Sequence, residues 1–427
     1  MRLKDSSAMF SAGPVFEDRL EGGLRVFSNH VPHVQSITLG VWINAGSRED
    51  PEDMAGLAHF LEHAVFKGTR TRDYLEIASC IEEVGGYIDA YTTKENTCIY
   101  IRCLRQHAPL AFSLLADLTG SPVFPDDELE KEKEVVIEEI HGIDDSPEEL
   151  IFDRFDTLAF PRHPLGPAIL GTEESIESIT PQALRRFMRQ HYVAENMILT
   201  AVGNISREEV LRQAEQHFSE LRKSPESAGP ERTFSTGDYV AFSAREEKPL
   251  SQGHLLYGLA APRDDTFFYG LMLLNTVLSG GMSSRLNIEL REKAALAYNA
   301  YSSLTLFDDV TLFNIYAGTD ADNIAKAVAI MKNMLDPEKL SAMDRKEFLA
   351  AKNKLQGALV MGMEKMTRRM SKAARDMFYF GRHISIEEKL AGIEALAAED
   401  LGRSAAYLRR HADASLLVYE PDGEDEE

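Results

Sequence analysis

Residues 56–69 read Gly56-Leu57-Ala58-His59-Phe60-Leu61-Glu62-His63-Ala64-Val65-Phe66-Lys67-Gly68-Thr69. If this stretch is helical, His59 and His63 lie four residues apart and share one face. Glu62 follows His59 by three residues, so its carboxylate points toward the same side. Two imidazoles one turn apart can bind the same metal ion. We therefore expect a helix that presents two metal ligands and a carboxylate.

The order His-x-x-Glu-His is the zinc-binding pattern of the inverzincin proteases. Zinc would lie roughly 2.0–2.1 Å from each imidazole nitrogen. Glu62 is then placed to act as a general base that activates water at the zinc, without being a ligand. Such a site needs a third protein ligand and an open position for water.

An acidic helix predicted over residues 126–143 offers the candidates for the third ligand. At about 100° per residue, its apolar residues form one stripe. Glu132 and Glu139 border that stripe on the same side, whereas Glu138 points away from it. Spacing alone leaves both Glu132 and Glu139 open as the ligand.

Composition limits the classes of function. The chain has 427 residues, 44% of them hydrophobic and 27% charged, which predicts a globular protein of two or more domains. Its net charge of −23 argues against nucleic-acid binding. The charge is compatible with a cationic peptide as a binding partner, or it serves only solubility.

The cellular compartment is predicted from the cysteine pattern and from the lack of signal and membrane-spanning segments. Cys80, Cys98 and Cys103 cannot all pair and show no CxxC spacing, which favours a reducing compartment and buried apolar roles. The first residues, Met1 to Ser6, show no apolar signal segment, and no long apolar run predicts a membrane span. We expect a cytoplasmic protein without membrane contacts.

The order of predicted elements repeats. Residues 226–236 lie in a polar stretch rich in Pro and Gly, and we place the linker there, between domains at 1–225 and 237–427. Strand, helix, helix, hairpin and helix follow one another in both halves, which predicts duplication of one α/β domain. In the second half, Met363, Met366, Met370 and Met377 form a stripe at helical spacing that is typical of core packing.

The chain resembles the M16 (pitrilysin/insulinase) family of zinc metallopeptidases, in particular the M16B branch that includes mitochondrial processing peptidase and its bacterial homologues. The segments that carry the resemblance are 56–69, Gly85-Gly86 with Ala90-x-Thr92, 136–140, 163–166, 280–286 and 291–298. The implied fold is α+β: two homologous α/β domains (LuxS/MPP-like, with an antiparallel-rich sheet and helices packed on one face) that form a clamshell around a chamber.

The resemblance also implies roles. His59, His63 and Glu139 correspond to the family's zinc ligands, one ion per chain, and Glu132 to a supporting acidic residue. Ala90, Tyr91 and Thr92 correspond to an edge strand that binds substrate. Arg291 and Tyr298 correspond to a pair that the second half supplies to stabilise the developing oxyanion. Asp89 departs from the family, which often has Asn there, and this puts the substrate preference in doubt.

These expectations combine into a zinc endopeptidase that hydrolyses extended or unfolded peptides bound by strand addition, and acts as a homodimer. The competing interpretations are a non-catalytic scaffold or assembly subunit with this fold, or a metal-free peptide carrier. The intact ligands and base favour the enzyme.

Overall fold

The computed structural model describes residues 13–226 and 231–422. Within these ranges the chain forms two compact units. Unit 1 contains residues 13–142, 167–226 and 362–384, and unit 2 contains residues 143–166, 231–361 and 385–422. Each unit is built on one β-sheet with helices packed on it, so the predicted α+β fold class is confirmed.

Six strands form the sheet of unit 1, in the order β1-β2-β6-β3-β5-β4. β2 and β6 are parallel, and all other neighbours are antiparallel. β4 ends the sheet, so its outer edge pairs with no described strand. The strands are β1 (Val15–Arg19), β2 (Arg25–His30), β3 (Ser36–Ile43), β4 (Tyr87–Thr92), β5 (Thr97–Leu104) and β6 (Met197–Gly203).

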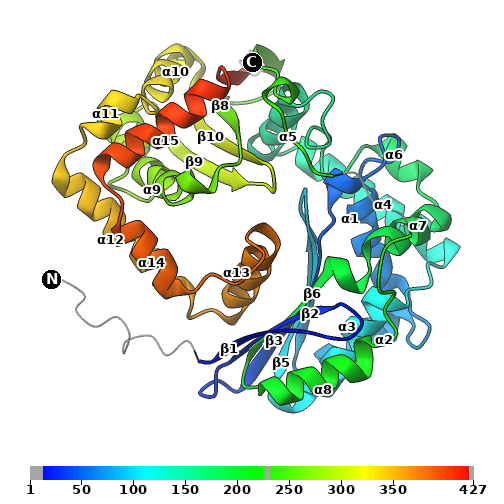
Figure 1. Ribbon diagram of the computed structural model, residues 1–427. Coiled ribbons are helices and arrows are strands. Elements are labelled where there is room, and N and C mark those ends of the chain that lie inside the picture. The colour runs from blue at the N-terminus through cyan, green and yellow to red at the C-terminus, as the bar shows by residue number, and fades with distance from the viewer. Residues whose placement is uncertain (1–12, 227–230, 423–427) are drawn as a thin grey trace. The chain divides into compact units, whose positions relative to one another are not determined.

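Helices cover both faces of this sheet, because β3 carries apolar side chains on both sides. The expectation of helices on one face is therefore incomplete. Ile37, Leu39, Val41 and Ile43 alternate along the strand and join the larger core cluster, with helices on that face. Trp42 faces the other way and packs with Met370 and Met377 of α13. Figure 1 shows α3 and α8 on one side of the sheet and α13 on the other. The helices are α1 (Leu57–Ala64), α3 (Ala108–Gly120), α8 (Arg207–Phe218) and α13 (Met366–Tyr379).

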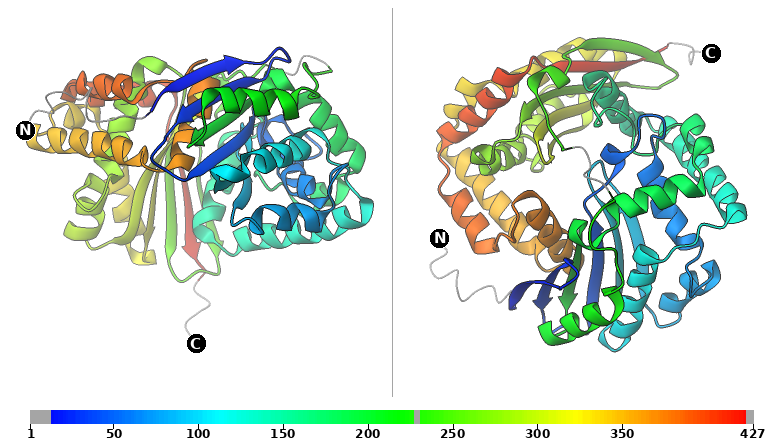
Figure 2. Two further views of the ribbon diagram at one scale, coloured as in Figure 1. Left: turned by 90° about the horizontal axis from the view of Figure 1, so that it is seen from below. Right: turned by 45° about the vertical axis from the view of Figure 1, so that its right-hand side comes forward.

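Five strands form the sheet of unit 2, in the order β7-β11-β8-β10-β9. The last strand of the chain, β11, is red in Figure 2 and lies between a parallel neighbour, β7, and an antiparallel neighbour, β8. Helices α9, α10 and α15 contact one face of the sheet, and α5 contacts β8 and β11 through Ile151 and Phe155 on the other. The strands are β7 (Ser243–Lys248), β8 (Gly253–Pro262), β9 (Ala297–Leu306), β10 (Val310–Thr319) and β11 (Ser415–Pro421). The helices are α5 (Pro147–Ala159), α9 (Phe268–Ser279), α10 (Ile324–Asn333) and α15 (Ala398–His411).

The two sheets share one topology. β2, β6, β3, β5 and β4 correspond in order and direction to β7, β11, β8, β10 and β9, with one parallel pair in each sheet. The predicted pair of homologous units is therefore confirmed. The remaining helices are α2 (Tyr74–Glu82), α4 (Asp126–Asp144), α6 (Glu173–Ser178), α7 (Pro181–His191), α11 (Pro337–Ser341), α12 (Arg345–Gly362) and α14 (Ile386–Glu394).

Two helices are exchanged between the halves of the sequence. α5 comes from the first half and packs in unit 2, while α13 comes from the second half and packs in unit 1. The chain passes between the units several times, and one of these passages, after residue 230, falls within the predicted linker at 226–236. Residues 227–230 lie outside the described ones, so the linker stays a prediction. The methionine stripe is confirmed as core for Met370 and Met377, each only 1% exposed, and Met366 packs partly buried against the same cluster. Met363 departs from the prediction, because it lies in the turn before α13 and is only partly buried.

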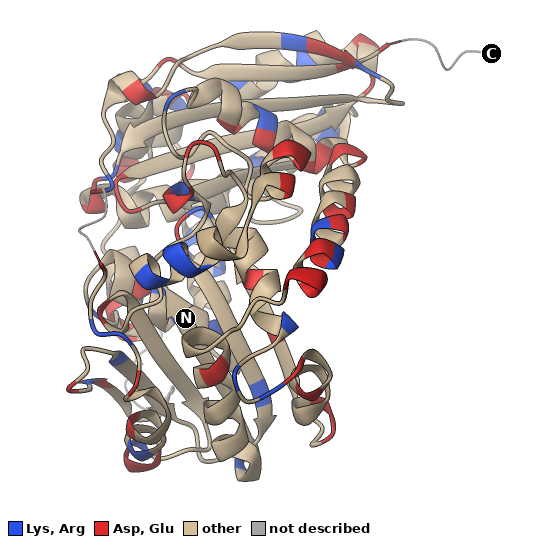
Figure 3. Cartoon of the chain, turned by 90° about the vertical axis from the view of Figure 1, so that its right-hand side faces the viewer, with Lys and Arg blue, Asp and Glu red and all other residues tan. Residues whose placement is uncertain are grey.

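The cysteines are unpaired, as their spacing predicted. Cys98 and Cys103 are buried. None of the helices in the described residues is both long and apolar enough to cross a membrane. The residues behind the signal-segment prediction, Met1 to Ser6, lie outside the described ranges. On the face drawn in Figure 3, blue Lys and Arg segments are scattered among red Asp and Glu segments.

Candidate metal centre

Helix α1 forms at Gly56 because the backbone there is sharply turned and capped. Gly56 has φ of 90°, and a Cβ on it would lie 2.4 Å from the carbonyl oxygen of Leu170, so only glycine is accommodated. The carboxylate of Asp50 accepts hydrogen bonds of 2.8 Å from the backbone N–H groups of Gly56 and Ala58, which satisfies the helix N-terminus. Phe60 and Leu61 are buried in the core, and this orientation turns the two histidines to the opposite face.

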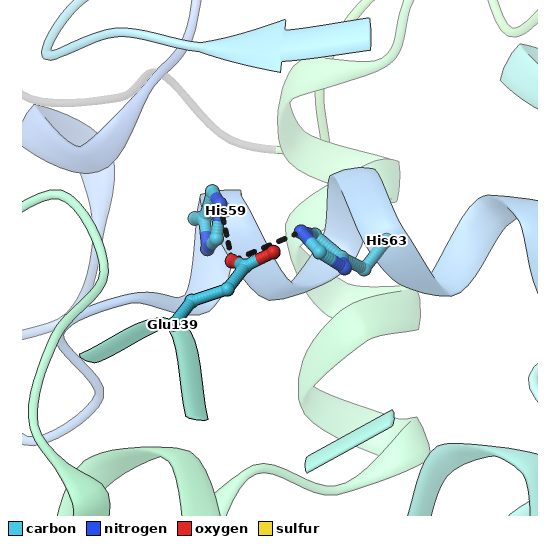
Figure 4. Close-up of side chains that lie close together, drawn as sticks. All are labelled: His59, His63 and Glu139. Atoms are coloured by element: carbon cyan, nitrogen blue, oxygen red, sulfur yellow. Dashed lines mark ion pairs between the residues drawn. The ribbon is translucent and has the colours of Figure 1, made fainter. Parts of the chain in front are cut away.

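His59 and His63 converge on Glu139 of α4. Nε2 of His59 lies 3.7 Å from Oε2 of Glu139, and Nε2 of His63 lies 3.6 Å from the same oxygen. Figure 4 shows both rings on α1 directed at this carboxylate. The side chain of Glu139 is 44% exposed, so the cluster has one side open to solvent.

This donor set fits a zinc ion. Ligand atoms of the three residues all lie within 4.8 Å of one another. In a tetrahedral site with bonds of roughly 2.0–2.1 Å, two ligand atoms lie about 3.3 Å apart, close to the separations seen here. Two imidazoles, one carboxylate and one open position are the ligand set of hydrolytic zinc sites. Nδ1 of His59 is buried and has no hydrogen-bond partner among the described residues.

Glu132 supports His63 from behind. Nδ1 of His63 donates a hydrogen bond of 2.8 Å to Oε1 of Glu132, whose other oxygen pairs with Lys67. Because Nδ1 carries the proton, Nε2 of His63 keeps its lone pair for a metal. Glu132 and Glu139 thus take different positions: Glu139 faces both histidines, and Glu132 holds one of them. Glu138, predicted to point away, is exposed.

Glu62 is buried next to the two histidines and is held by Thr92. Oγ1 of Thr92 donates a hydrogen bond of 2.6 Å to Oε2 of Glu62. Thr92 is the last residue of β4, so the edge strand and the carboxylate are directly connected. The sequence predicted Thr92 as part of a substrate-binding strand, and its hydrogen bond to Glu62 was not foreseen.

Burial and neighbouring charges shift the pKa values of these groups. Burial, with the nearby His63, lowers the pKa of His59 to about 4, so its imidazole is neutral and able to bind a metal. Burial raises the pKa of Glu62 to about 7, against the opposing hydrogen bond from Thr92. Burial alone would lower the pKa of His63, but the hydrogen bond to Glu132 and the charges of Glu139 and Glu62 together raise it. Burial alone would raise the pKa of Glu132, but its bonds to His63 and Lys67 together lower it.

The predicted substrate strand is β4. Ile88, Ala90 and Thr92 alternate with Asp89 and Tyr91 on opposite faces of the strand. Ala90 packs against the core that contains α1, and Tyr91 packs against the cluster that contains α13. Asp89 accepts a hydrogen bond of 2.9 Å from the hydroxyl of Tyr100 and lies on the face of Tyr91. The outer edge of β4 can therefore accept another strand, with Tyr91 and Asp89 on one face of the extended sheet.

Arg291 and Tyr298 lie in unit 2 and contact each other. The guanidinium of Arg291 lies 4.7 Å from the ring centroid of Tyr298, and Tyr298 is 84% exposed. Arg291 belongs to a π-helical turn, Asn287–Lys293, of a kind often found at functional sites. Tyr298 follows at the start of β9, the edge strand of its sheet.

Sequence reasoning missed two supporting residues. Lys67 pairs with Glu132, and Asp50 caps α1. A signal for Lys67 was present in its spacing, four residues after His63, which would place it on the same face of a continuous helix. In the structure α1 ends at Ala64, and Lys67 reaches Glu132 from the 3-10 turn Val65–Lys67. Asp50 lies in the loop before the helix. Its capping role could not be predicted from spacing, because it depends on the path of that loop.

Two family models together match most of the chain. Residues 25–173 match the family Insulinase (Peptidase family M16), and residues 178–355 match Peptidase M16 inactive domain. A protein of Mycobacterium tuberculosis named as an uncharacterized zinc protease is 35% identical over 401 residues, 93% of this chain and 92% of the relative. The chain belongs to peptidase family M16.

The chain is also similar to a second named protein and to two solved structures. A Bacillus subtilis protein, also named as an uncharacterized zinc protease, is 32% identical over 404 residues, 94% of this chain and 97% of that protein. The crystal structure of a Helicobacter pylori protease has the same fold, with a TM-score of 0.87 and 24% identity over 96% of this chain and 100% of that chain. A Pseudomonas fluorescens structure described as a peptidase M16 inactive domain has a TM-score of 0.86 and 24% identity over 96% of this chain and 98% of that chain.

Proposed function

We propose that this M16 protein is a zinc-dependent endopeptidase with one zinc site per chain, formed by His59, His63 and Glu139. The observation that carries the proposal is the convergence of both Nε2 atoms on Oε2 of Glu139, at 3.7 and 3.6 Å. Relatives that match over most of their length are named zinc proteases, which supports the same metal.

Glu62 serves as the general base. Bound zinc would act as a Lewis acid that activates water and polarises the scissile carbonyl. Glu62, with a pKa raised to about 7, accepts a proton from the attacking water and returns it to the leaving amine. Thr92 donates to Oε2 of Glu62, which orients the carboxylate and leaves its other oxygen to move the proton.

The substrate is an extended peptide that adds to the outer edge of β4. Backbone groups of Ala90, Tyr91 and Thr92 would bind it through main-chain hydrogen bonds, which requires an unfolded or flexible segment. Because Thr92 also holds Glu62, a peptide bound along this edge ends close to the general base.

Arg291 and Tyr298 are proposed to stabilise the negative charge that develops on the carbonyl oxygen. Their mutual contact and the exposure of Tyr298 leave the phenol available to a substrate. Tyr298→Phe should lower kcat while zinc content stays at the wild-type value. An unchanged kcat would remove Tyr298 from the mechanism.

Homodimer formation and a cytoplasmic location stay predictions. Light scattering on the purified chain measures the first directly. One comparison favours the alternative of a non-catalytic scaffold: residues 178–355, most of them in the second half, match a family described as inactive. The second half contains no His-x-x-Glu-His, whereas the first half carries the three candidate metal ligands and Glu62.

The deciding experiment measures zinc and cleavage together. We expect about one zinc per purified chain, in line with the one three-ligand cluster found among the described residues. Glu62→Gln should retain the zinc and abolish cleavage of a mixed peptide library followed by mass spectrometry. Glu83→Gln, an exposed carboxylate after α2, is the matched control and should cleave like wild type. Zinc-free protein with intact ligands, or cleavage by the Glu62→Gln variant, would contradict the proposal.

A further inference from the structure

The turn that joins β4 to β5 is buried although its residues are polar. Lys94, Glu95 and Asn96 are only 6%, 1% and 5% exposed. Hairpin turns normally lie at the surface, because buried polar groups need partners. This turn, residues 93–96, must therefore be held by specific contacts.

Part of the turn is held by the first half of the sequence. Arg48 pairs with Oε1 of Glu95 at 2.6 Å, and both side chains are almost fully buried. The backbone N–H groups of Ser47 and Arg48 donate to the carbonyls of Thr93 and Lys94, at 3.1 and 2.8 Å. A Cβ on Gly46 would lie 2.1 Å from the carbonyl oxygen of Thr93, so the two loops pack in direct backbone contact.

The remaining oxygen of Glu95 is held by α13. The hydroxyl of Tyr379 donates a hydrogen bond of 2.9 Å to Oε2 of Glu95 and accepts one of 3.3 Å from Nδ2 of Asn96. Tyr379 is the last residue of α13, on the segment 362–384 that packs in unit 1. A helix from the second half thus holds a buried turn in the first, across 284 residues of sequence.

The same hairpin carries the partner of Glu62. Thr92 immediately precedes the turn, and its hydroxyl donates a hydrogen bond to Glu62. Thr97 immediately follows the turn, and its hydroxyl donates a hydrogen bond of 3.0 Å to the carbonyl of Ala45. On the other face of β4, Tyr91 meets Trp42 edge to face at 5.8 Å, in the cluster that contains Met370 and Met377. The position of the turn relative to α13 therefore determines where Thr92 meets Glu62.

We propose that Tyr379 is a positioning residue for hydrolysis: through Glu95 and Asn96 it fixes the β4–β5 hairpin so that Thr92 stays on Glu62 and β4 keeps its place as the substrate edge. This inference rests on the function proposed above. It makes the docking of α13 a requirement for cleavage, although α13 contributes no metal ligand or base.

The test removes one hydroxyl from the full-length protein. Tyr379→Phe keeps the ring and loses both hydrogen bonds. We expect unchanged zinc content, faster amide hydrogen exchange across residues 92–97, and kcat for fluorescence-quenched peptides reduced at least about 10-fold, with a smaller change in KM. Tyr74→Phe, a half-exposed tyrosine on α2, is the matched control and should behave as wild type.

A double-mutant cycle separates positioning from general destabilisation. If Tyr379 acts through Thr92, then Tyr379→Phe should lower kcat strongly in the wild-type background and little in a Thr92→Val background. Equal effects in both backgrounds, or a kcat for Tyr379→Phe equal to that of Tyr74→Phe, would overturn the inference. Asn96→Ala, which removes one of the two bonds, repeats the measurement if Tyr379→Phe does not fold.

Failure of the proposed function gives a different result. If the wild-type chain binds no zinc or if Glu62→Gln still cleaves, the peptidase proposal fails for reasons independent of Tyr379. In that case hydrogen exchange at residues 92–97 still decides whether Tyr379 fixes the hairpin, and unchanged exchange in Tyr379→Phe overturns that part as well.

Discussion

Nδ1 of His63 lies 2.8 Å from Oε1 of Glu132, while Nε2 of the same ring lies 3.6 Å from Oε2 of Glu139. Two glutamates one heptad apart on α4 thus meet opposite nitrogens of one imidazole. Outer carboxylates of this kind fix the tautomer and raise the basicity of a metal-binding histidine.

Glu132→Gln should weaken zinc binding about 10–100-fold, the usual effect of losing a carboxylate behind a ligand histidine. Competition with a chromogenic chelator measures the affinity. Glu130→Gln is the control on the same helix, since the side chain of Glu130 is 71% exposed. Equal affinities for the two variants would show that Glu132 does not support the site.

Glu139→Gln should reduce zinc affinity more than Glu132→Gln does, because it removes a candidate ligand rather than an outer carboxylate. Glu138→Gln is the adjacent control and should retain about one zinc per chain, since its side chain is exposed. Metal analysis after gel filtration compares the two. Zinc loss from Glu138→Gln with retention in Glu139→Gln would reverse the assignment.

Thr92→Val should lower kcat about 10-fold or more, because a hydrogen bond to a charged group contributes about 1.5–3 kcal/mol. Thr92→Ser keeps the hydroxyl and should recover most of the activity. Steady-state cleavage of a quenched peptide distinguishes the two variants. A valine variant as active as the serine variant would mean that the bond to Glu62 has no catalytic consequence.

Met370→Ala should destabilise unit 1 by about 2–5 kcal/mol, since it removes a fully buried side chain between α13 and the sheet. Met361→Ala is the control: Met361 is 63% exposed, so the change should stay within about 0.5 kcal/mol. Denaturant unfolding provides both values. Similar stabilities would indicate that α13 does not pack on this sheet in solution.

Acid should destabilise unit 2 through His254. Burial lowers the pKa of this imidazole, whose Nδ1 lies 2.7 Å from the hydroxyl of Tyr316. The unfolded chain therefore binds a proton more readily than the folded one, and the free energy of unfolding falls as the pH drops below about 6.5. His254→Gln should reduce this dependence when denaturant unfolding is compared at about pH 7 and about pH 5. An identical slope in both proteins would exclude His254 as the source.

Local sequence determined the parts of the site that lie within single helices. Spacing of four residues puts His59 and His63 on one face of α1, and about 100° per residue puts Glu132 and Glu139 on one side of α4. The duplicated sheet was also foreseen, because element order repeats along the chain. These features follow from backbone geometry, which depends on residues near in sequence.

Helical periodicity left Glu132 and Glu139 both open as the ligand, and the family resemblance pointed to Glu139. What the tertiary structure decided is the arrangement behind that choice: Glu139 faces both histidines, and Glu132 holds His63 from behind. That choice depends on how α4 packs against α1, and helical periodicity carries no information on the distance between two helices. The sequence also did not predict the exchange of α5 and α13 between the halves. A methionine stripe predicts that one helix face is buried, but it does not indicate which sheet the helix packs on. Tyr379 meets Glu95 across 284 residues, a contact set by long-range packing of side chains rather than by local conformational preference.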